Sequence, residues 1–138
     1  MTTDIATKPP VTPQLAEEQA KLDPLSSRYV DVESLEWEPT PAEGIHMKVL
    51  MKDDRGRMTA LIRWQPGAKL PLHLHNDIEQ SYVLEGSLAD HEGECMAGQF
   101  VYRPAGNTHR AWSPNGAVLL AIFLTPNTFL EGDRAEKQ

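Results

Sequence analysis

The sequence predicts an all-β domain in which short strands close into a small barrel or sandwich, behind an N-terminal arm that is irregular or briefly helical. Three observations support this fold class. Apolar and polar residues alternate over several short stretches, which is the period of a half-buried strand. Glycine, proline, aspartate and asparagine cluster between these stretches and mark turns. The 138 residues suffice for one domain with a buried core, and they contain no internal repeat.

The N-terminal arm differs in composition from the chain that follows. Prolines punctuate residues 1–27, and the stretch PQLAEEQAKL at 13–22 is a helix candidate because Thr12 precedes a proline at its first turn. We expect this arm to pack on the domain or on a second subunit, or else to be a loose tail. Residues 28–130 are predicted to form the folded domain, and residues 131–138 a charged tail.

The folded domain is predicted to consist of strands joined by tight turns. Candidate strands are YVDV at 29–32, IHMKVLMKD at 45–53, RMTALIRWQ at 57–65, GQFVYRP at 98–104 and AVLLAIFL at 117–124. The polar sequence DDRG joins the second and third of these strands, PGAK forms a turn further on, and 37–44 reads as a loop. The last strand is apolar at every position, so we expect both of its faces to be buried.

Residues 73–86, HLHNDIEQSYVLEG, contain two of the five histidines of the chain. The alternation around them indicates a pair of strands rather than a helix. Side chains at positions i and i+2 of a strand share a face, so His73 and His75 point the same way and Glu79 follows in the same parity. Three side chains able to ligate a metal therefore lie on one side of the predicted sheet.

A third histidine follows the stretch GQFVYRPAGNTH. Here a strand and a tight turn precede His109 at the start of the next strand, which returns this side chain across the barrel toward the first three residues. Three imidazoles and a carboxylate suit a divalent transition metal such as iron, manganese, zinc, nickel or copper. A barrel wall supplies the rigidity with which such ligands must converge.

The spacing of these residues resembles the two motifs of the cupin family. The first motif places Gly67, His73, His75, Glu79 and Gly86 at the family's intervals. The resemblance implies a single cupin jelly-roll β-barrel, or double-stranded β-helix, whose metal is bound by the two histidines and the glutamate of this motif together with a histidine of the second.

The second motif runs from Gly98 through Pro104 and Gly106 to His109. The family pattern closes with an asparagine where this chain has Ser113, a position in a structural turn and not a ligand. By this resemblance His109 is the fourth metal ligand. The motif glycines also fit positions where a turn needs a positive φ or a close backbone approach.

Two functions compete. With its Trp-Glu-Pro loop, the chain resembles small single-domain cupins that are acetylacetone-cleaving or related dioxygenases. This resemblance implies a mononuclear non-haem Fe(II) enzyme that cleaves a C–C bond in a small diketone- or hydroxyketone-like substrate. Those enzymes bind iron through three histidines alone, whereas this chain keeps Glu79. The stretches SRYVDVESLEWEP, TALIRWQPGAKLPLHLHNDIEQSYVLEG and AGQFVYRPAGNTHRAWSPNGAVLLAIF instead resemble the cupin-like domain of ChrR-type zinc-dependent anti-sigma factors. The alternative is therefore a stand-alone zinc-binding cupin with a sensor or ligand-binding role and no catalysis.

We expect the enzyme rather than the sensor. The expected cofactor is one divalent transition metal per chain, with Fe(II) as the first choice and Zn, Mn and Ni as alternatives. The arm of 27 residues is too short for the helical sigma-binding domain of a full anti-sigma factor and holds no cysteine or histidine. An isomerase or sugar-binding cupin is a third, weaker reading. Arg63, Arg103 and Tyr82 are candidate substrate contacts, since an arginine inside a barrel holds a carboxylate or enolate by paired hydrogen bonds. His46 and His91 are read as surface residues.

Composition limits the partners. The formal net charge is −7, and no basic run or basic helix occurs, which argues against nucleic acid and against an anionic membrane surface. The single cysteine, Cys95, is read as a buried side chain, and the lack of an internal disulfide and of a signal-peptide pattern favours a cytoplasmic protein. Tyr82 and Leu84 should lie on the outer face of the barrel, and this apolar face predicts a homodimer.

Overall fold

The computed structural model describes residues 21–132, and the chain divides into two units, one that ends at Glu36 and one that begins at Trp37. The described part of the first unit holds one 3₁₀ turn, η1, at Val32–Ser34. The strand predicted at 29–32 is wrong: the carbonyl of Asp31 accepts hydrogen bonds from the backbone N–H and the hydroxyl of Ser34, at 3.1 and 2.8 Å, and so closes a turn instead of pairing in a ladder. The helix predicted at 13–22 falls almost wholly outside the described residues.

The second unit is an antiparallel β-structure of ten strands within the described residues. The strands are β1 (Glu38–Pro39), β2 (Ile45–Lys52), β3 (Met58–Trp64), β4 (Lys69–Leu74), β5 (Glu79–Asp90), β6 (Gly93–Met96), β7 (Phe100–Arg103), β8 (Thr108–Trp112), β9 (Ala117–Phe123) and β10 (Thr128–Phe129). The predicted strands that correspond to β2, β3, β7 and β9 are confirmed, as is the strand pair around the histidines. In residues 21–132 no helix has the length and apolarity needed to cross a membrane.

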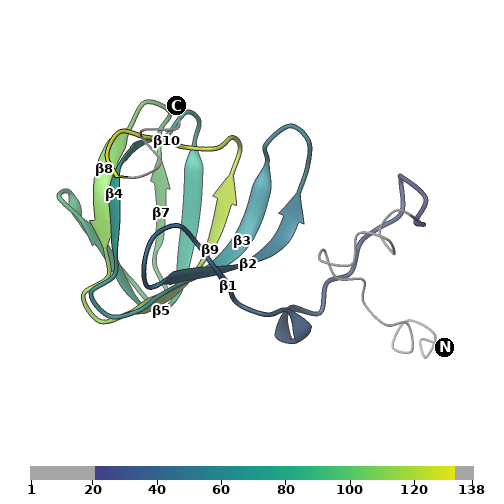
Figure 1. Ribbon diagram of the computed structural model, residues 1–138, viewed down its shortest axis with the longest axis horizontal. Coiled ribbons are helices and arrows are strands. Elements are labelled where there is room, and N and C mark those ends of the chain that lie inside the picture. The colour runs from purple at the N-terminus through teal and green to yellow at the C-terminus, as the bar shows by residue number, and fades with distance from the viewer. Residues whose placement is uncertain (1–20, 133–138) are drawn as a thin grey trace. The chain divides into compact units, whose positions relative to one another are not determined.

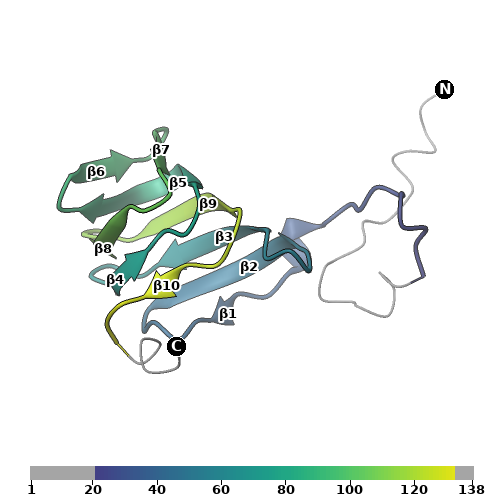
Figure 2. The same cartoon turned by 90° about the horizontal axis from the view of Figure 1, so that it is seen from above.

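The strands curl into a barrel because β5 belongs to both of its walls. Its first half pairs with β7 and β9, and β9 continues through β3 and β2 to β1. Its second half pairs with β6 and, at a single position, with β8, which continues through β4 to β10. A register shift in β5 between Val83 and Glu85 marks the bend between the two halves. Figures 1 and 2 show β4, β8 and β10 lying across from β2, β3 and β9.

The core fills the space between the walls. Alternate residues of β3 and β9 point inward, so Ala60, Ala121 and Leu119 are almost fully buried. The expectation that β9 is buried on both faces needs correction. Its other face, which includes Leu120, is only half-buried because it lies on the outside of the barrel. An all-apolar strand here therefore leaves an apolar outer surface.

Ser113, which stands where the cupin pattern has asparagine, is fully buried just after β8. Its hydroxyl donates to the carbonyl of Ser87 at 2.7 Å, and its carbonyl accepts from the N–H of Gly67 at 2.7 Å. The serine thus ties the turn after β8 to β5, which is the structural role expected at this position.

Candidate metal centre

Two neighbouring strands bring three histidines together. His73 on β4 stands directly opposite His109 on β8 in the register of the pair. His75 follows β4, and its backbone N–H donates to the carbonyl of Asn107 at 2.8 Å while its carbonyl accepts from the N–H of Gly106 at 2.7 Å. The Pro-Ala-Gly-Asn turn before β8 therefore holds the His75 backbone beside His109. The sequence prediction that these three side chains converge is confirmed by their positions.

The three imidazole rings form a compact triangle. Their centroids are 4.8 Å apart for His73 and His75, 4.6 Å for His73 and His109, and 4.9 Å for His75 and His109. All three side chains are buried, and their candidate ligand nitrogens lie within 4.8 Å of one another. Three buried imidazoles at this spacing are able to hold a divalent transition metal.

Hydrogen bonds determine which ring nitrogen is left free to bind a metal in two of the three histidines, His73 and His109. The Nδ1 of His73 lies 2.7 Å from the carbonyl oxygen of Pro71, which can only accept, so Nδ1 carries the proton and Nε2 is left as a ligand. Both ring nitrogens of His75 are buried, and among the described residues neither makes a well-aligned hydrogen bond. Burial holds the pKa of His73 below its ordinary value, although the Pro71 carbonyl opposes this, and so favours the neutral, metal-binding form.

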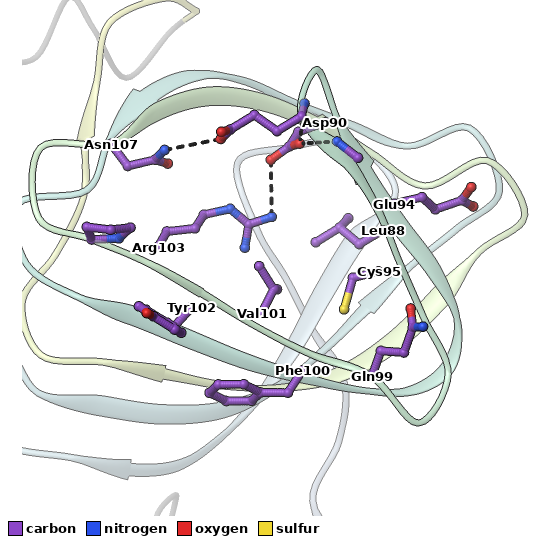
Figure 3. A pocket seen from close by; sticks show the side chains of 13 residues that line it. Leu88, Asp90, Glu94, Cys95, Gln99, Phe100, Val101, Tyr102, Arg103 and Asn107 are labelled. Carbon is purple, nitrogen blue, oxygen red and sulfur yellow. Dashed lines mark hydrogen bonds and ion pairs between the residues drawn. The ribbon is translucent and has the colours of Figure 1, made fainter.

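His109 is oriented from behind by a carboxylate and a buried arginine. Its Nδ1 lies 2.8 Å from Oδ2 of Asp90 and 3.2 Å from Nε of Arg103, and it cannot both donate to the first and accept from the second. The shorter contact and the negative charge of Asp90 favour a proton on Nδ1, which leaves Nε2 toward the triangle. Arg103 also donates from Nη2 to Asp90 at 3.3 Å, as Figure 3 shows.

These charges shift the pKa values of both partners. Burial, with the Arg103 charge beside it, lowers the pKa of His109 to about 4, although the contact with Asp90 opposes the shift. Burial would raise the pKa of Asp90, but the hydrogen bond to His109, backbone N–H donors and the Arg103 charge outweigh it and lower this pKa to about 2. At neutral pH the site therefore contains a neutral imidazole backed by an ionised carboxylate.

Glu79, the fourth predicted ligand, starts β5 at the edge of the triangle. Its Oε1 lies 3.4 Å from Nδ1 of His75, and its Oε2 lies 4.0 Å from Nη1 of Arg103. Asn127 donates to Oε1 at 3.3 Å. Burial would raise the pKa of Glu79, but the His75 ring and the Arg103 charge outweigh it and keep this pKa below its ordinary value. Glu79 is thus an ionised carboxylate adjacent to the histidines, outside their tightest group.

The triangle opens onto a mostly apolar cavity of about 520 Å³ inside the barrel. His73, His109 and Glu79 contribute to its wall, and the remainder comes mainly from inward side chains of β2, β3 and β9. A cavity of this size, lined by apolar groups with a few polar ones, is typical of a small-molecule site. A second pocket of about 910 Å³ lies behind His109, where Asp90, Arg103 and Cys95 line it (Figure 3).

The three predicted substrate contacts lie in different places. Arg63 stands between two inward residues of β3, and its guanidinium carbon lies 4.5 Å from the centroid of the Trp37 ring, on the outside of the barrel. Tyr82 follows the buried Ser81 and is 43% exposed, also on the outer face. Arg103 is buried against Asp90 and His109 and lines the pocket behind the histidines.

The sequence interpretation did not find the residues that support the histidines. Asp90 lies in a stretch that reads as a surface turn, and its distance of 19 positions from His109 carries no motif. Asn127 and Phe129 come from the segment around β10, where Phe129 packs on His73 with ring centroids 5.3 Å apart. No pattern in the sequence marks these residues, because they act only through the folded arrangement.

A comparison with protein families agrees with the fold and the histidine triangle. The model of the ChrR cupin-like domain matches residues 25–128, which is most of the chain and includes all three histidines. The chain belongs to this family. No curated protein matches the sequence of this cupin.

Solved structures of other proteins share the cupin fold. A candidate acetylacetone dioxygenase from Methylibium petroleiphilum PM1 has a TM-score of 0.73 and 23% identity, over 82% of this chain and 87% of that one. An acetylacetone dioxygenase from Acinetobacter johnsonii has a TM-score of 0.72 and 17% identity, over 83% and 85%. A chain of the Rhodobacter sphaeroides complex of SigE with the anti-sigma ChrR has a TM-score of 0.59 and 20% identity, over 88% and 72%. Likeness at these identities establishes the fold.

Proposed function

We propose that this cupin is a mononuclear non-haem Fe(II) dioxygenase that cleaves a C–C bond in a small diketone- or hydroxyketone-like substrate. His73, His75, Glu79 and His109 are the proposed ligands. The observation that carries the proposal is the buried histidine triangle at the wall of a mostly apolar cavity of about 520 Å³. Two neighbours of this fold are named for acetylacetone dioxygenase activity, which supports the choice of substrate class.

The residues fit a metal on structural grounds. Both ring nitrogens of His75 are buried, and among the described residues neither makes a well-aligned hydrogen bond; the Glu79 carboxylate approaches Nδ1 only to 3.4 Å, so a ligand in the triangle would satisfy the ring. His73 and His109 turn Nε2 inward, and the ionised Glu79 adds one negative charge at the edge. When bound there, Fe(II) supplies Lewis acidity toward substrate oxygens and a redox centre for dioxygen.

The chain itself contributes orientation and a dry environment. The Asp90 carboxylate and the Pro71 carbonyl hold two imidazoles in the ligand tautomer before the metal arrives. Inward apolar side chains such as Leu119 and Ile62 line the cavity beside the triangle and limit the water around a bound substrate. These features bind and position a small oxygenated molecule of low polarity.

The family match favours a second candidate, a stand-alone zinc-binding cupin with a sensor or ligand-binding role. The matched family is named for ChrR, and a structure with this fold is the complex of an anti-sigma ChrR with SigE. A carboxylate beside three histidines also offers zinc four ligands in a closed site, which is typical of a structural or sensory centre.

Metal content and oxygen chemistry separate the two candidates. Protein purified without chelators should contain iron close to one equivalent per chain by elemental analysis, and it should consume dioxygen when a β-diketone such as acetylacetone is added. Zinc at one equivalent with no oxygen uptake after iron loading would overturn the dioxygenase proposal and support the sensory candidate.

Variants test the ligand assignment separately from the reaction. His75→Ala and His109→Ala should each abolish stoichiometric metal binding, because each removes one of three converging imidazoles. His46→Ala and His91→Ala are matched controls outside the triangle, and both should retain metal. Full metal content in His75→Ala or His109→Ala would contradict the assignment.

We further propose that residues 28–130 form the cupin domain, between an arm at 1–27 and a tail at 131–138.

We also propose that this cupin forms a homodimer through the outer face of the barrel wall that contains β5 and β7. Tyr82, Phe100 and Tyr102 are 43%, 53% and 63% exposed there, and Phe100 pairs with Tyr82 across the two strands. A cluster of exposed aromatic side chains such as this one is typical of a protein–protein interface.

A further inference from the structure

Both oxygens of the Glu79 carboxylate lie beside protein groups that compete with a metal for them. Oε1 accepts a hydrogen bond from Nδ2 of Asn127 at 3.3 Å and lies 3.4 Å from Nδ1 of His75. Oε2 lies 4.0 Å from Nη1 of Arg103. Because an ionised carboxylate only accepts hydrogen bonds, the Asn127 amide must turn its Nδ2 toward Glu79. The protein therefore holds this carboxylate by its own donors.

In this position Glu79 does not belong to the triangle of ligand atoms. Within residues 21–132, the group whose candidate ligand atoms lie within 4.8 Å of one another consists of His73, His75 and His109. Glu79 has to move toward these histidines in order to bind the same ion. Any such movement alters its contacts with Asn127 and Arg103.

Asn127 is held in place by hydrogen bonds to the residues on either side of it. Nδ2 of Asn76 donates to the carbonyl oxygen of Pro126 at 2.9 Å and to the hydroxyl of Thr128 at 2.8 Å. Asn76 directly follows His75 in the chain. The amide of Asn127 is thus anchored to the segment that carries two of the histidines, and it keeps its place when the carboxylate moves.

The Glu79 carboxylate has space in which to move. Glu79 and Asn127 line the cavity of about 520 Å³ together with His73 and His109. The Glu79 side chain borders this open space and is 12% exposed. Rotation about its χ angles redirects the carboxylate without any movement of β5.

We propose that Asn127 is a positioning residue that makes Glu79 an exchangeable metal ligand. This rests on the proposed function, in which Glu79 ligates Fe(II) and a diketone- or hydroxyketone-like substrate binds the same ion. Glu79 binds the metal when substrate is absent, and it returns to the Asn127 amide when the substrate enolate binds. The metal–carboxylate bond then breaks as the bonds to the enolate oxygens form, and the proton that the substrate loses passes to water.

The hydrogen bond from Asn127 has opposite effects on the two binding events. When a metal binds the metal-free protein, Glu79 leaves the amide, so the hydrogen bond opposes metal binding. When a β-diketone displaces Glu79 from the metal, the hydrogen bond forms again and favours diketone binding. A hydrogen bond to a charged group is strong enough for an effect of about tenfold on each equilibrium.

The affinities for zinc and for a β-diketone, measured separately, test this proposal. Zinc affinity is measured by competition with a chromophoric chelator. Binding of acetylacetone to the zinc-loaded protein, in which no turnover occurs, is measured by calorimetry. Asn127→Leu removes the amide and keeps a side chain of similar size. Asn115→Leu is the matched control, at an exposed asparagine in the loop between β8 and β9.

We expect Asn127→Leu to bind zinc about tenfold more tightly than wild type and acetylacetone about tenfold less tightly. Asn115→Leu should match wild type in both affinities. In a Glu79→Gln background, Asn127→Leu should change neither affinity by more than about twofold, because the carboxylate on which the amide acts is gone.

General damage to the site would weaken both affinities, so the opposite directions are the decisive result. Zinc binding by Asn127→Leu that is weaker than or equal to that of wild type would overturn the role of Asn127. An acetylacetone affinity that does not fall would overturn it as well. In both cases the proposed function stands as long as the zinc-loaded wild-type protein binds acetylacetone. Failure of the metal-loaded wild-type protein to bind any β-diketone would overturn both proposals.

Discussion

Asp90 does for His109 what the Pro71 carbonyl does for His73. Each accepts the Nδ1 proton, at 2.8 and 2.7 Å, and so leaves Nε2 directed at the other rings. Asp90 differs from a carbonyl in its full negative charge, which makes the imidazole a better electron donor. Arg103 is bonded to the same carboxylate oxygen and keeps the acid ionised.

Replacing Asp90 should weaken metal binding without removing a ligand. We expect Asp90→Asn to lower zinc affinity by about 10–100-fold, because the supporting charge on His109 is lost while the ring can still donate to the amide oxygen. Competition against a chromophoric chelator measures this. Asp54→Asn, in the exposed turn after β2, is the matched control and should bind zinc as wild type does. An affinity for Asp90→Asn within twofold of wild type would show that Asp90 does not support the site.

The metal-free protein should become less stable as the pH decreases, because folding lowers the pKa of the His73 and His109 rings. Burial lowers the pKa of His73 and, to about 4, that of His109. An unfolded chain takes up these protons near the ordinary value of about 6.5, so the free energy of unfolding is fully retained above that pH and decreases progressively toward about pH 4. Below about pH 3.8, protonation of Asp90, whose folded pKa is about 2, removes more.

Urea unfolding of the metal-free protein at pH 7.5, 6, 5 and 4 measures this dependence. The midpoint should move to lower urea at each step below pH 6.5. His109→Gln should show a smaller decrease, and His91→Gln, in the turn between β5 and β6, should follow wild type. A midpoint that does not change between pH 7.5 and pH 4 would show that these rings are not held neutral by the fold.

The histidines were predictable because their positions in sequence translate directly into positions on strands. Alternation fixes the common face of His73 and His75, and the turn before His109 fixes its return. The roles of Asp90 and Arg103 were not predictable, since an aspartate at the end of a strand or an arginine in a barrel has many equally good environments. Only the folded register shows that Asp90 meets His109.

At the scale of elements, β5 determines how the two walls meet. It pairs with β9 and β7 over its first half and with β6 over its second, and the chain passes from one to the other near Gly86. At this residue φ is +69°, and a Cβ atom would lie 1.8 Å from the carbonyl oxygen of Gly116. That same oxygen accepts the N–H of Ser87 at 3.1 Å, so a side chain at 86 would break the connection.

Alanine at this position should therefore be strongly destabilising. We expect Gly86→Ala to lower the free energy of unfolding by more than about 2 kcal/mol, or to prevent folding, from backbone strain and the displaced carbonyl together. Gly93→Ala is the control: no atom lies within 4 Å of the added Cβ and φ is not positive there, so it should stay within about 1 kcal/mol of wild type. Similar urea midpoints for the two variants would contradict this account of the bend.

The length of an element decided whether its pattern could be read. β2, β3 and β9 have enough residues to show alternation or a continuous apolar run, and their turns carry glycine and aspartate. The two-residue β1 and β10 are too short to have a period of their own. The stretch at 29–32 has the composition of a strand, but a turn closed by Ser34 competes successfully for the Asp31 carbonyl.

At the scale of the whole molecule, the remaining question is what covers the apolar outer face of the β5–β7 wall. Tyr82, Leu84 and Phe100 are each more than two-fifths exposed, and the rings of Phe100 and Tyr102 lie 6.4 Å apart. Within residues 21–132, β5 is the strand that pairs with β7, so β7 also presents an edge with unpaired backbone groups. Exposed aromatic side chains and an exposed strand edge together favour association with another chain.

A second copy of this cupin satisfies both features at once, because a two-fold axis places the same aromatic face on each partner. We expect wild-type protein to sediment as a dimer and Phe100→Glu to shift it to the monomer, since a charge at the centre of the face would be buried without a partner. Leu130→Glu is the matched control: Leu130 is 48% exposed after β10, away from this face, and its variant should stay dimeric. A monomeric wild type would contradict the homodimer and would point to another part of the same chain as the cover of this face.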